Sequence, residues 1–190
     1  MNTLFTEESF DKIDYKESGL PKGEYDSCIF KYCDLSNVDL SGTKFIDCKF
    51  LDCNISLAKL HKTTFRSTAF KDCKLIGLKW ESCNEFGLLF NFENCNLNHS
   101  SFYQMKIKHT TFKKTQLQDV DFTECDLSSS VFDYCDLTNA VFDNTVLEKA
   151  NFITSYDYSI DPEKNKIKKA KFSMPEVVGL LDKYQIEIER

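Results

Sequence analysis

Glycine and proline are scarce in this sequence, with 6 and 3 copies in 190 residues. Two-residue β-hairpins depend on glycine in their turns, so a protein built from many such hairpins is disfavoured. No apolar run approaches the roughly 18 residues of a membrane-spanning helix, and we expect no membrane partner. The first residues have neither a basic start nor an apolar stretch, which argues against a secretory signal and makes the cytoplasm the expected location.

Positive charge is also in short supply. Lys and Arg number 24 against 30 Asp and Glu, so the formal net charge is −6 at pH 7. Nucleic-acid-binding proteins neutralise phosphates with Lys and Arg, so this excess of acid excludes a surface that grips nucleic acid throughout. We therefore expect no direct nucleic-acid partner.

Recognisable catalytic and cofactor motifs are missing. The three histidines have no neighbouring Cys or carboxylate pair, and there is no glycine-rich phosphate loop. The nine cysteines include no Cys-x-x-Cys pair, which argues against zinc. Their odd number and the expected cytosolic setting argue against disulfides. We expect no enzyme activity, no cofactor and no metal.

A large apolar residue stands at every fifth position. The series runs from Phe5 to Trp80, is interrupted, and resumes two residues late from Phe92 to Phe152. A period of five fits neither an α-helix nor a flat strand. If each large residue is called i, position i−2 is mostly small, and eight of the nine cysteines occupy it. We expect i and i−2 to face inward, where a small, weakly polar Cys is readily accepted.

Residue shape also repeats every 20 positions, as in Phe92, Phe112, Phe132 and Phe152. Like residues 20 apart predict a four-sided coil of 20 residues, stacked on the next coil at the ~4.8 Å spacing of β-strands. About 130 residues of repeat then make six to seven coils, a rod roughly 30 Å long. Corners built from the coil itself explain the low glycine and proline content.

This pattern resembles that of the pentapeptide-repeat family, whose motif is A(D/N)LXX. The clearest matching stretches are Val38-Asp39-Leu40-Ser41-Gly42, Cys125-Asp126-Leu127-Ser128-Ser129, Cys135-Asp136-Leu137-Thr138-Asn139 and Ala150-Asn151-Phe152-Ile153-Thr154. The resemblance covers roughly residues 24–152. It implies an all-β fold, a right-handed quadrilateral parallel β-helix, which we expect to end in a short C-terminal capping and dimerisation helix.

Three segments are expected along the chain. Residues 1–152 form the β-helix, with a break in phase at 81–91 where Gly87 is a candidate for positive φ. The break is either a two-residue bulge that bends the rod or a recognition loop. Residues 153–173 form an irregular last coil, and residues 174–190 form the C-terminal helix and tail.

Acidic residues are concentrated between positions 115 and 148, which contain no Lys or Arg. All of them occupy outward positions and create a strong local negative potential on a rigid rod. They either keep the protein in solution or imitate the phosphate rows of DNA toward a DNA-binding protein. The candidate partner-binding face consists of Asp119, Asp121, Glu124, Asp126, Asp133, Asp136, Asp143 and Glu148.

The last segment has a helical pattern. Ser173 and Glu176 match a capping box, and an apolar stripe follows them. This stripe is expected to cover the last coil and to form a homodimer interface. Ile186 and Ile188 then alternate with acids, as in a short strand. The stripe consists of Val177, Leu180, Leu181 and Tyr184.

The tail is similar to the ends of the Qnr quinolone-resistance proteins and of the microcin-B immunity protein, through its Asp161-Pro162-Glu163 segment and the Gly-Leu-Leu stretch after it. That resemblance implies a tail-to-tail dimer, a rod with the size and charge of B-form DNA, and binding to DNA gyrase or topoisomerase IV. The two long loops of the Qnr coils are missing here. We expect a non-enzymatic DNA mimic; the alternative is a structural or protein-interaction scaffold with an unknown partner.

Overall fold

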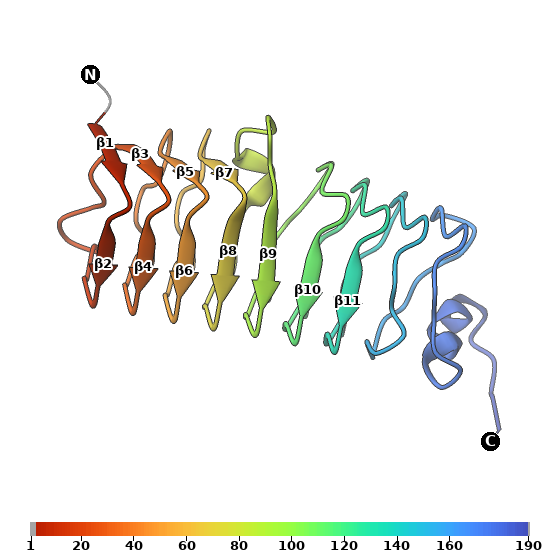
Figure 1. The fold of residues 1–190 in the computed structure, drawn as a ribbon. Helices are drawn as coiled ribbons and strands as arrows, with labels where there is room; N and C mark the ends of the chain where they lie inside the picture. Colours follow the sequence, from red (N-terminus) through yellow and green to blue (C-terminus); the bar gives the residue numbers. More distant parts are fainter. Residues whose placement is uncertain (1–2, 190) are drawn as a thin grey trace.

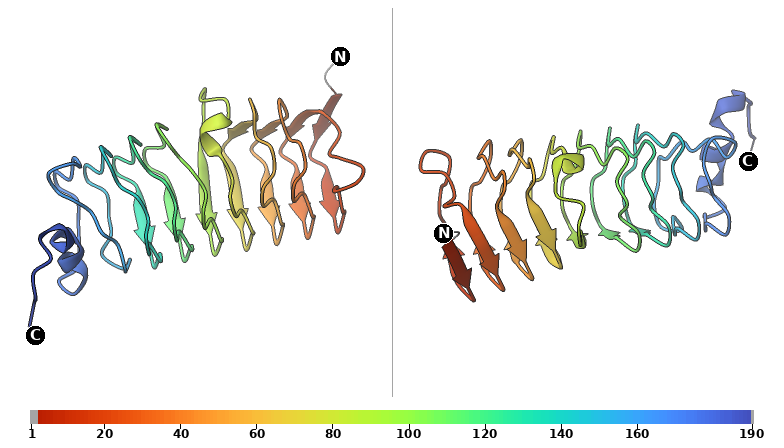
Figure 2. Two further views of the ribbon diagram at one scale, coloured as in Figure 1. Left: turned by 180° about the vertical axis from the view of Figure 1, so that it is seen from behind. Right: turned by 90° about the horizontal axis from the view of Figure 1, so that it is seen from above.

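The computed structural model describes residues 3–189, which wind into a rod of stacked coils with the two chain ends at opposite ends of the rod (Figures 1 and 2). Every strand pairs in parallel with the strand one coil away. The first sheet contains β1 (Thr3–Thr6), β3 (Gly23–Asp26), β5 (Lys44–Ile46) and β7 (Thr64–Arg66). The second sheet contains β2 (Ser9–Asp11), β4 (Ile29–Lys31), β6 (Lys49–Leu51), β8 (Thr68–Lys71), β9 (Phe90–Glu93), β10 (Thr111–Lys113) and β11 (Val131–Asp133).

Four sides make up each coil, and we name them A to D in chain order. In the coil 43–62, side A carries Phe45, side B Phe50, side C Ile55 and side D Leu60. The first sheet is side A of the coils before the break, and the second sheet is side B of the rod. Sides C and D are tied to the neighbouring coils by isolated bridges in place of strands.

The register between coils advances by 20 residues. Phe30 pairs with Phe50 before the break in phase, and Phe112 pairs with Phe132 after it. At the break the register advances by 22, because Phe70 pairs with Phe92. The prediction of a parallel β-solenoid with one coil per 20 residues is therefore confirmed.

Residues i fill the interior as continuous columns. Adjacent rings of the side B column have centroids 4.6–5.4 Å apart and planes tilted by 4–15°. Stacking of this kind adds to the stabilisation that burial alone provides. The column consists of Phe10, Phe30, Phe50, Phe70, Phe92, Phe112, Phe132, Phe152 and Phe172.

Residues i−2 pack beside the columns, and many of those with a thiol or hydroxyl group donate a hydrogen bond to the coil before them. The Cys135 thiol donates to the carbonyl of Phe112 over 3.3 Å, and the Thr145 hydroxyl donates in the same way to Phe122 over 2.8 Å. Position i−2 therefore favours a small side chain with a hydrogen-bond donor, which explains why Cys, Ser and Thr recur there. All nine cysteines are free and buried.

The corners of the coil are made by left-handed residues at i+2. Among residues 3–189, 24 non-glycine residues at i+2 have φ between 50° and 62°, Leu57 and Tyr134 among them. Such backbone conformations are costly for residues with a Cβ atom. The corner N–H groups donate to the next coil, as from Tyr32 to the Leu51 carbonyl at 3.0 Å. This repeated ladder holds the corners in place and explains how the rod turns with so few glycines.

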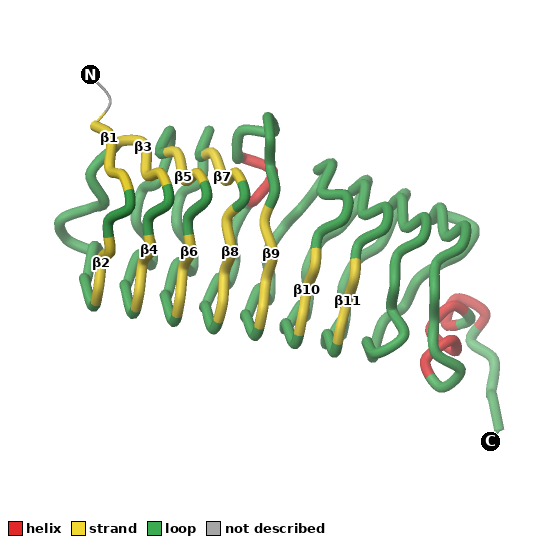
Figure 3. The backbone as a smooth tube through the Cα atoms, viewed as in Figure 1, coloured by secondary structure: helices red, strands yellow, loops and turns green. Residues whose placement is uncertain are grey.

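The break in phase inserts two residues at the corner between sides D and A. It begins with the 3-10 segment η1 (Trp80–Ser82), which lies beside the first sheet in Figure 3. Phe90 then enters the interior, 5.2 Å from the Trp80 ring, whereas Phe86 is 78% exposed. Gly87 has a φ of 74°, as the sequence predicts. The break is a two-residue bulge that also presents an aromatic side chain to solvent.

The prediction of a C-terminal α-helix is wrong as to the type of helix. The sequence predicts one helix from residue 174 onward and a strand at 186–188. The structure shows two short 3-10 segments, η2 (Glu176–Leu180) and η3 (Asp182–Tyr184), and the described part of the tail beyond them contains no strand (Figure 3).

One local feature and one contact with the last coil explain this difference. The Val177-Val178-Gly179 run has low α-helix propensity. The Gly179 carbonyl also accepts a hydrogen bond from the Ile160 N–H at 3.0 Å, so the last coil, which carries Ile160, holds the segment against itself. Within residues 3–189, no helix combines the length and apolar character that crossing a membrane requires.

Candidate partner-binding surfaces

The aspartates at position i−1 hold the turns of the coil. The Asp121 carboxylate accepts the Thr123 N–H at 2.8 Å, and the Asp136 carboxylate accepts the Thr138 N–H at 3.0 Å and its hydroxyl at 2.6 Å. Asp39 accepts the Ser41 N–H at 2.9 Å in the same manner. Each carboxylate thus serves as the hydrogen-bond acceptor for the backbone N–H two residues later. This explains in structural terms why Asp or Asn occurs at i−1.

The eight acidic residues predicted as one face encircle the rod. Each five-residue repeat moves the chain to the next side, so acids in consecutive repeats lie on different sides. We call them the acidic belt. Asp126 and Glu148 lie on side A, Asp133 on side B, Asp136 on side C, Asp121 and Asp143 on side D, and Asp119 and Glu124 at corners.

Few belt residues stack on one another along the rod. The residue one coil beyond Asp121 is Val141, and the residue one coil beyond Asp126 is Val146. The signal that could have shown this is the 20-residue spacing of the sequence, because residues 20 apart share a side. The belt is therefore a ring of charge about two coils deep, without long rows.

Hydrogen bonds lower the pKa of two belt carboxylates, Asp126 and Asp136. Burial acts to raise the pKa of Asp126, but hydrogen bonds from Ser128 and from the Lys108 ammonium at 3.0 Å outweigh it, so its pKa lies below the ordinary value. The pKa of Asp136 is lowered against burial by its bonds to Thr138. Both groups are negatively charged at neutral pH.

Charge changes sign several times along the rod. Residues 125–144 contain four Asp and no Lys or Arg, which makes this coil the densest part of the belt. Residues 43–84 contain eight Lys or Arg against four Asp or Glu. Residues 165–171 contain four Lys and no acid. The negative potential of the protein is therefore local.

The tail presents apolar side chains to solvent. Of the four residues predicted as a dimer interface, Leu181 and Tyr184 are 37% and 53% exposed, whereas Val177 and Leu180 are half-buried. Sequence reasoning missed Val178, because it assumed α-helical spacing. A cavity of about 530 Å³ lies between the 3-10 segments and the end of the tail, where Ile186 and Ile188 line it. The exposed set, which we call the apolar tail surface, consists of Val178, Leu181, Tyr184, Ile186 and Ile188.

The repeat itself decides the family. The family model for the pentapeptide repeat region matches residues 24–91 and 79–152. The chain belongs to the pentapeptide-repeat family. No curated protein sequence matches this pentapeptide-repeat protein.

Solved structures show the same fold. Two trypsin-treated forms of QnrB1, described as a plasmid-mediated fluoroquinolone resistance protein, have TM-scores of 0.63 and 0.57 with 15% and 16% sequence identity. The matches cover 100% of this chain and 99% and 100% of those chains. HetL, a pentapeptide-repeat protein from Nostoc sp. strain PCC 7120, matches with a TM-score of 0.47 and 15% identity over 90% of this chain and 85% of HetL.

The cysteines of this pentapeptide-repeat protein belong to its core. Burial raises the pKa of Cys48 and of Cys135 to about 12, which leaves both thiols protonated and unreactive at neutral pH. Residues 3–189 contain no group of three or more His, Cys, Asp or Glu side chains placed to hold a metal ion. The thiols act as the i−2 hydrogen-bond donors described above.

Proposed function

We propose that this chain is a non-enzymatic binding protein that presents its acidic belt to the DNA-binding surface of a type II topoisomerase, DNA gyrase or topoisomerase IV. The observation that carries the proposal is the coil 125–144, with four aspartates and no basic residue on a rigid backbone. The partner class comes from the resemblance of the repeat and tail to Qnr proteins, and the fold likeness to QnrB1 supports it.

Charge density supports local mimicry of DNA. Duplex DNA carries one negative charge per about 1.7 Å of axis, so a length of ~4.8 Å, one coil, corresponds to about three charges. The four aspartates of residues 125–144 reach this density in formal charge, with lysines of neighbouring coils beside Asp126 and Asp143. Hydrogen bonds fix Asp126 and Asp136 in place. The net charge of −6, spread over the whole chain, falls well short of the charge density of DNA, so the contact with the topoisomerase centres on the belt.

We propose further that two copies pair through the apolar tail surface. Its five side chains are 37–56% exposed, and isologous pairing is the commonest way for a soluble protein to cover such a patch. Leu181→Asp places a charge in the contact and weakens association. Sedimentation velocity at high micromolar concentration should show a dimer for the native chain and a monomer for this variant. A native chain that stays at 22 kDa contradicts the dimer.

The test of the topoisomerase proposal is DNA supercoiling by gyrase, with and without ciprofloxacin, across a titration of the protein. We expect inhibition or rescue of supercoiling at micromolar protein. Asp126→Asn with Asp136→Asn keeps both turn hydrogen bonds and removes two belt charges, so it should weaken the effect several-fold. The matched control, Asp34→Asn with Asp39→Asn, changes two equivalent turns outside the belt. No effect of the native protein contradicts the proposal.

The scaffold alternative is favoured by the basic band at residues 43–84, which has no counterpart in DNA. A scaffold that holds partners of both charges would leave gyrase activity unaffected. In a pull-down experiment, reversing the charges of either the basic band or the acidic belt should then remove one bound partner. We place either activity in the cytoplasm. Nine buried, free thiols support a reducing compartment.

A further inference from the structure

The coil that closes the rod carries a cluster of basic side chains. Lys166 and Lys168 are exposed on side A, and Lys169 is exposed at the corner between sides A and B. Lys171 follows on side B, bridged to Asn151. Lys149 is exposed at the same corner as Lys169, one coil earlier, and donates its backbone N–H to the Lys168 carbonyl at 3.0 Å. We call these five residues the lysine patch.

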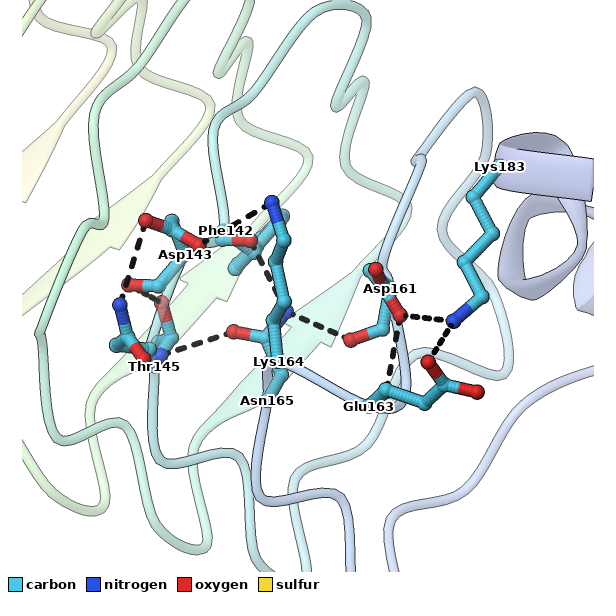
Figure 4. A network of polar contacts seen from close by, with 9 residues as sticks. Phe142, Asp143, Thr145, Asp161, Glu163, Lys164, Asn165 and Lys183 are labelled. Carbon is cyan, nitrogen blue, oxygen red and sulfur yellow. Dashed lines mark hydrogen bonds and ion pairs between the residues drawn. The ribbon is translucent and has the colours of Figure 1, made fainter.

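Two acids that precede Lys166 in the chain are already neutralised by another lysine. The Lys183 ammonium lies 2.8 Å from the Asp161 carboxylate and 2.7 Å from that of Glu163 (Figure 4). The Lys164 ammonium lies 3.9 Å from the Asp143 carboxylate. Among the described residues, none of the five members of the lysine patch has an ion-pair partner within 4.0 Å. Their charges are therefore available to a ligand.

The backbone under the patch is fixed. Asn165 is 5% exposed, and its side-chain amide donates to the carbonyls of Phe142 and Asp161 at 3.0 and 2.9 Å (Figure 4). Its side-chain oxygen accepts the Thr145 N–H at 2.8 Å. The bonds to Phe142 and Thr145 tie the patch coil to the coil before it, and the bond to Asp161 braces the patch coil itself. A ligand would not have to order the backbone, which lowers the entropic cost of binding.

We propose that the lysine patch binds the phosphate backbone of duplex DNA, a contact independent of the topoisomerase proposal. Lys166 and Lys168 stand two strand residues apart, about 6.6 Å, and the patch extends round a convex corner. Exposed lysine ammonium groups on a fixed backbone suit the outward-facing phosphates of a duplex. Ile167 and Ala170 lie between the lysines, so the patch lacks the aromatic rings on which single-stranded bases stack.

The densest coil of the acidic belt lies away from most of the lysine patch. This coil, residues 125–144, precedes the coil of Lys166, Lys168, Lys169 and Lys171 by two coils, about 10 Å along the rod, and the coil of Lys149 by one. This distance is about the Debye length at 0.1 M salt, so the repulsion between belt and DNA is largely screened there. Glu148 lies closer, one coil before Lys168 on side A. Glu148→Gln should therefore raise the affinity for DNA two- to threefold.

The experiment is fluorescence anisotropy of a labelled 20-base-pair duplex titrated with the full chain at 50–200 mM NaCl. Contact of about five phosphates predicts a slope of about −4.5 for log K against log[salt]. The variant K166Q/K168Q/K169Q/K171Q should bind at least tenfold more weakly at 50 mM NaCl, with a slope near −1. The control K49Q/K59Q/K71Q/K74Q removes the same charge from residues 43–84 and should change affinity less than threefold.

Three outcomes overturn the proposal. The first is no binding of the duplex at 50 mM NaCl up to 100 µM protein, the weak end of the ordinary range of non-specific DNA affinities at higher, physiological salt. The second is an equal loss of affinity in both quadruple variants, which would mean that total charge matters and the patch does not. The third is binding of vesicles with anionic lipid by a protein that leaves the duplex unbound, which would assign the lysines to a membrane surface.

Discussion

The two halves of the rod, residues 3–79 and 92–172, use the same repeat but arrange their aromatic rings differently. In the first half the two aromatic columns lie on the neighbouring sides A and B, as Phe45 and Phe50 do with centroids 5.2 Å apart. In the second half they lie on the opposite sides B and D, where Phe112 and Phe122 are 6.1 Å apart. Adjacent columns place the bulk at one corner, whereas opposite columns spread it across the interior.

The bulge marks the exchange of one aromatic column for another. Trp80 is the first aromatic residue on side D, and its ring stacks on Phe102 at 5.7 Å with planes 3° apart. On side A the aromatic column ends at Phe65, and aliphatic residues such as Leu127 follow after the break. Phe90 fills the corner that this change opens. A two-residue insertion therefore changes the packing of the core while side B continues unbroken.

The largest expected effect is from truncating the column that both halves share. Phe50→Ala and Phe112→Ala each remove a fully buried ring, and each should lower the free energy of unfolding by about 3–5 kcal/mol through lost burial and a residual cavity. Phe50→Ala should cost more, because Phe45 is closer to Phe50 than Phe122 is to Phe112. Urea denaturation measures both.

The matched control is Tyr134→Ala, an exposed ring on the same rod, which should change stability by less than about 0.5 kcal/mol. Similar, negligible losses for all three variants would contradict continuous interior columns. Equally large losses of stability for the two phenylalanine variants would support the interior columns. They would contradict the claim that adjacent columns pack more tightly than opposite ones.

A second effect separates the halves by adding bulk. Leu127→Phe places a ring on side A of the second half, between aromatic columns on sides B and D, and should cost about 1–3 kcal/mol by overpacking. The same side accepts Phe45 in the first half, because Leu40 and Leu60 occupy side D there. Leu127→Ile, of equal volume, should cost less than about 1.5 kcal/mol. A stable Leu127→Phe variant in thermal denaturation would mean that the second half has spare interior volume.

The interior could be predicted from the five-residue period alone, whereas the arrangement of the surface also requires the 20-residue period. The five-residue period places residues such as Phe112 and Cys135 inside, because their burial depends on the repeat alone. The side on which an acid such as Asp126 lies depends on counting coils of 20. The 3-10 form of the tail depends on the hydrogen bond between Ile160 and Gly179, a contact between segments that no local pattern encodes.

A third prediction compares one turn from each half. Asp39→Ala and Asp136→Ala each remove the acceptor of a backbone N–H two residues on, and each should cost about 1 kcal/mol of unfolding free energy. The corresponding Asn variants keep the acceptor and should cost little. Chemical denaturation of the four variants makes the test. An Asn variant as unstable as its Ala counterpart would show that charge, and not the turn hydrogen bond, stabilises the corner.

The same two aspartates make stability depend on pH. Hydrogen bonds from Ser41, helped by Lys22, lower the pKa of Asp39 to about 2, and the pKa of Asp136 is also lowered, by its bonds to Thr138 against burial. The ordinary pKa of an unfolded Asp is about 3.9, so this stabilisation is complete above that pH and is lost as the pH falls toward 2. Solvent exposure keeps each contribution small. Asp39→Asn should flatten the melting temperature between pH 4 and pH 2; an unchanged slope would contradict the assignment.

The smallest expected effect is at the exchange point itself. Trp80 is fully buried, with ring centroids of Phe90 and Phe92 at 5.2 and 5.5 Å, but within residues 3–189 its indole N–H has no hydrogen-bond partner. A buried, unpaired donor costs about 1–3 kcal/mol. Trp80→Phe removes this cost along with part of the packing, so the two changes should nearly cancel and leave stability within about 1 kcal/mol of the native value in urea denaturation. Trp80→Ala forfeits the packing as well and should cost about 3–5 kcal/mol. If Trp80→Phe is as damaging as Trp80→Ala, the indole shape is required at the exchange of columns, and the bulge and the tryptophan form one structural unit.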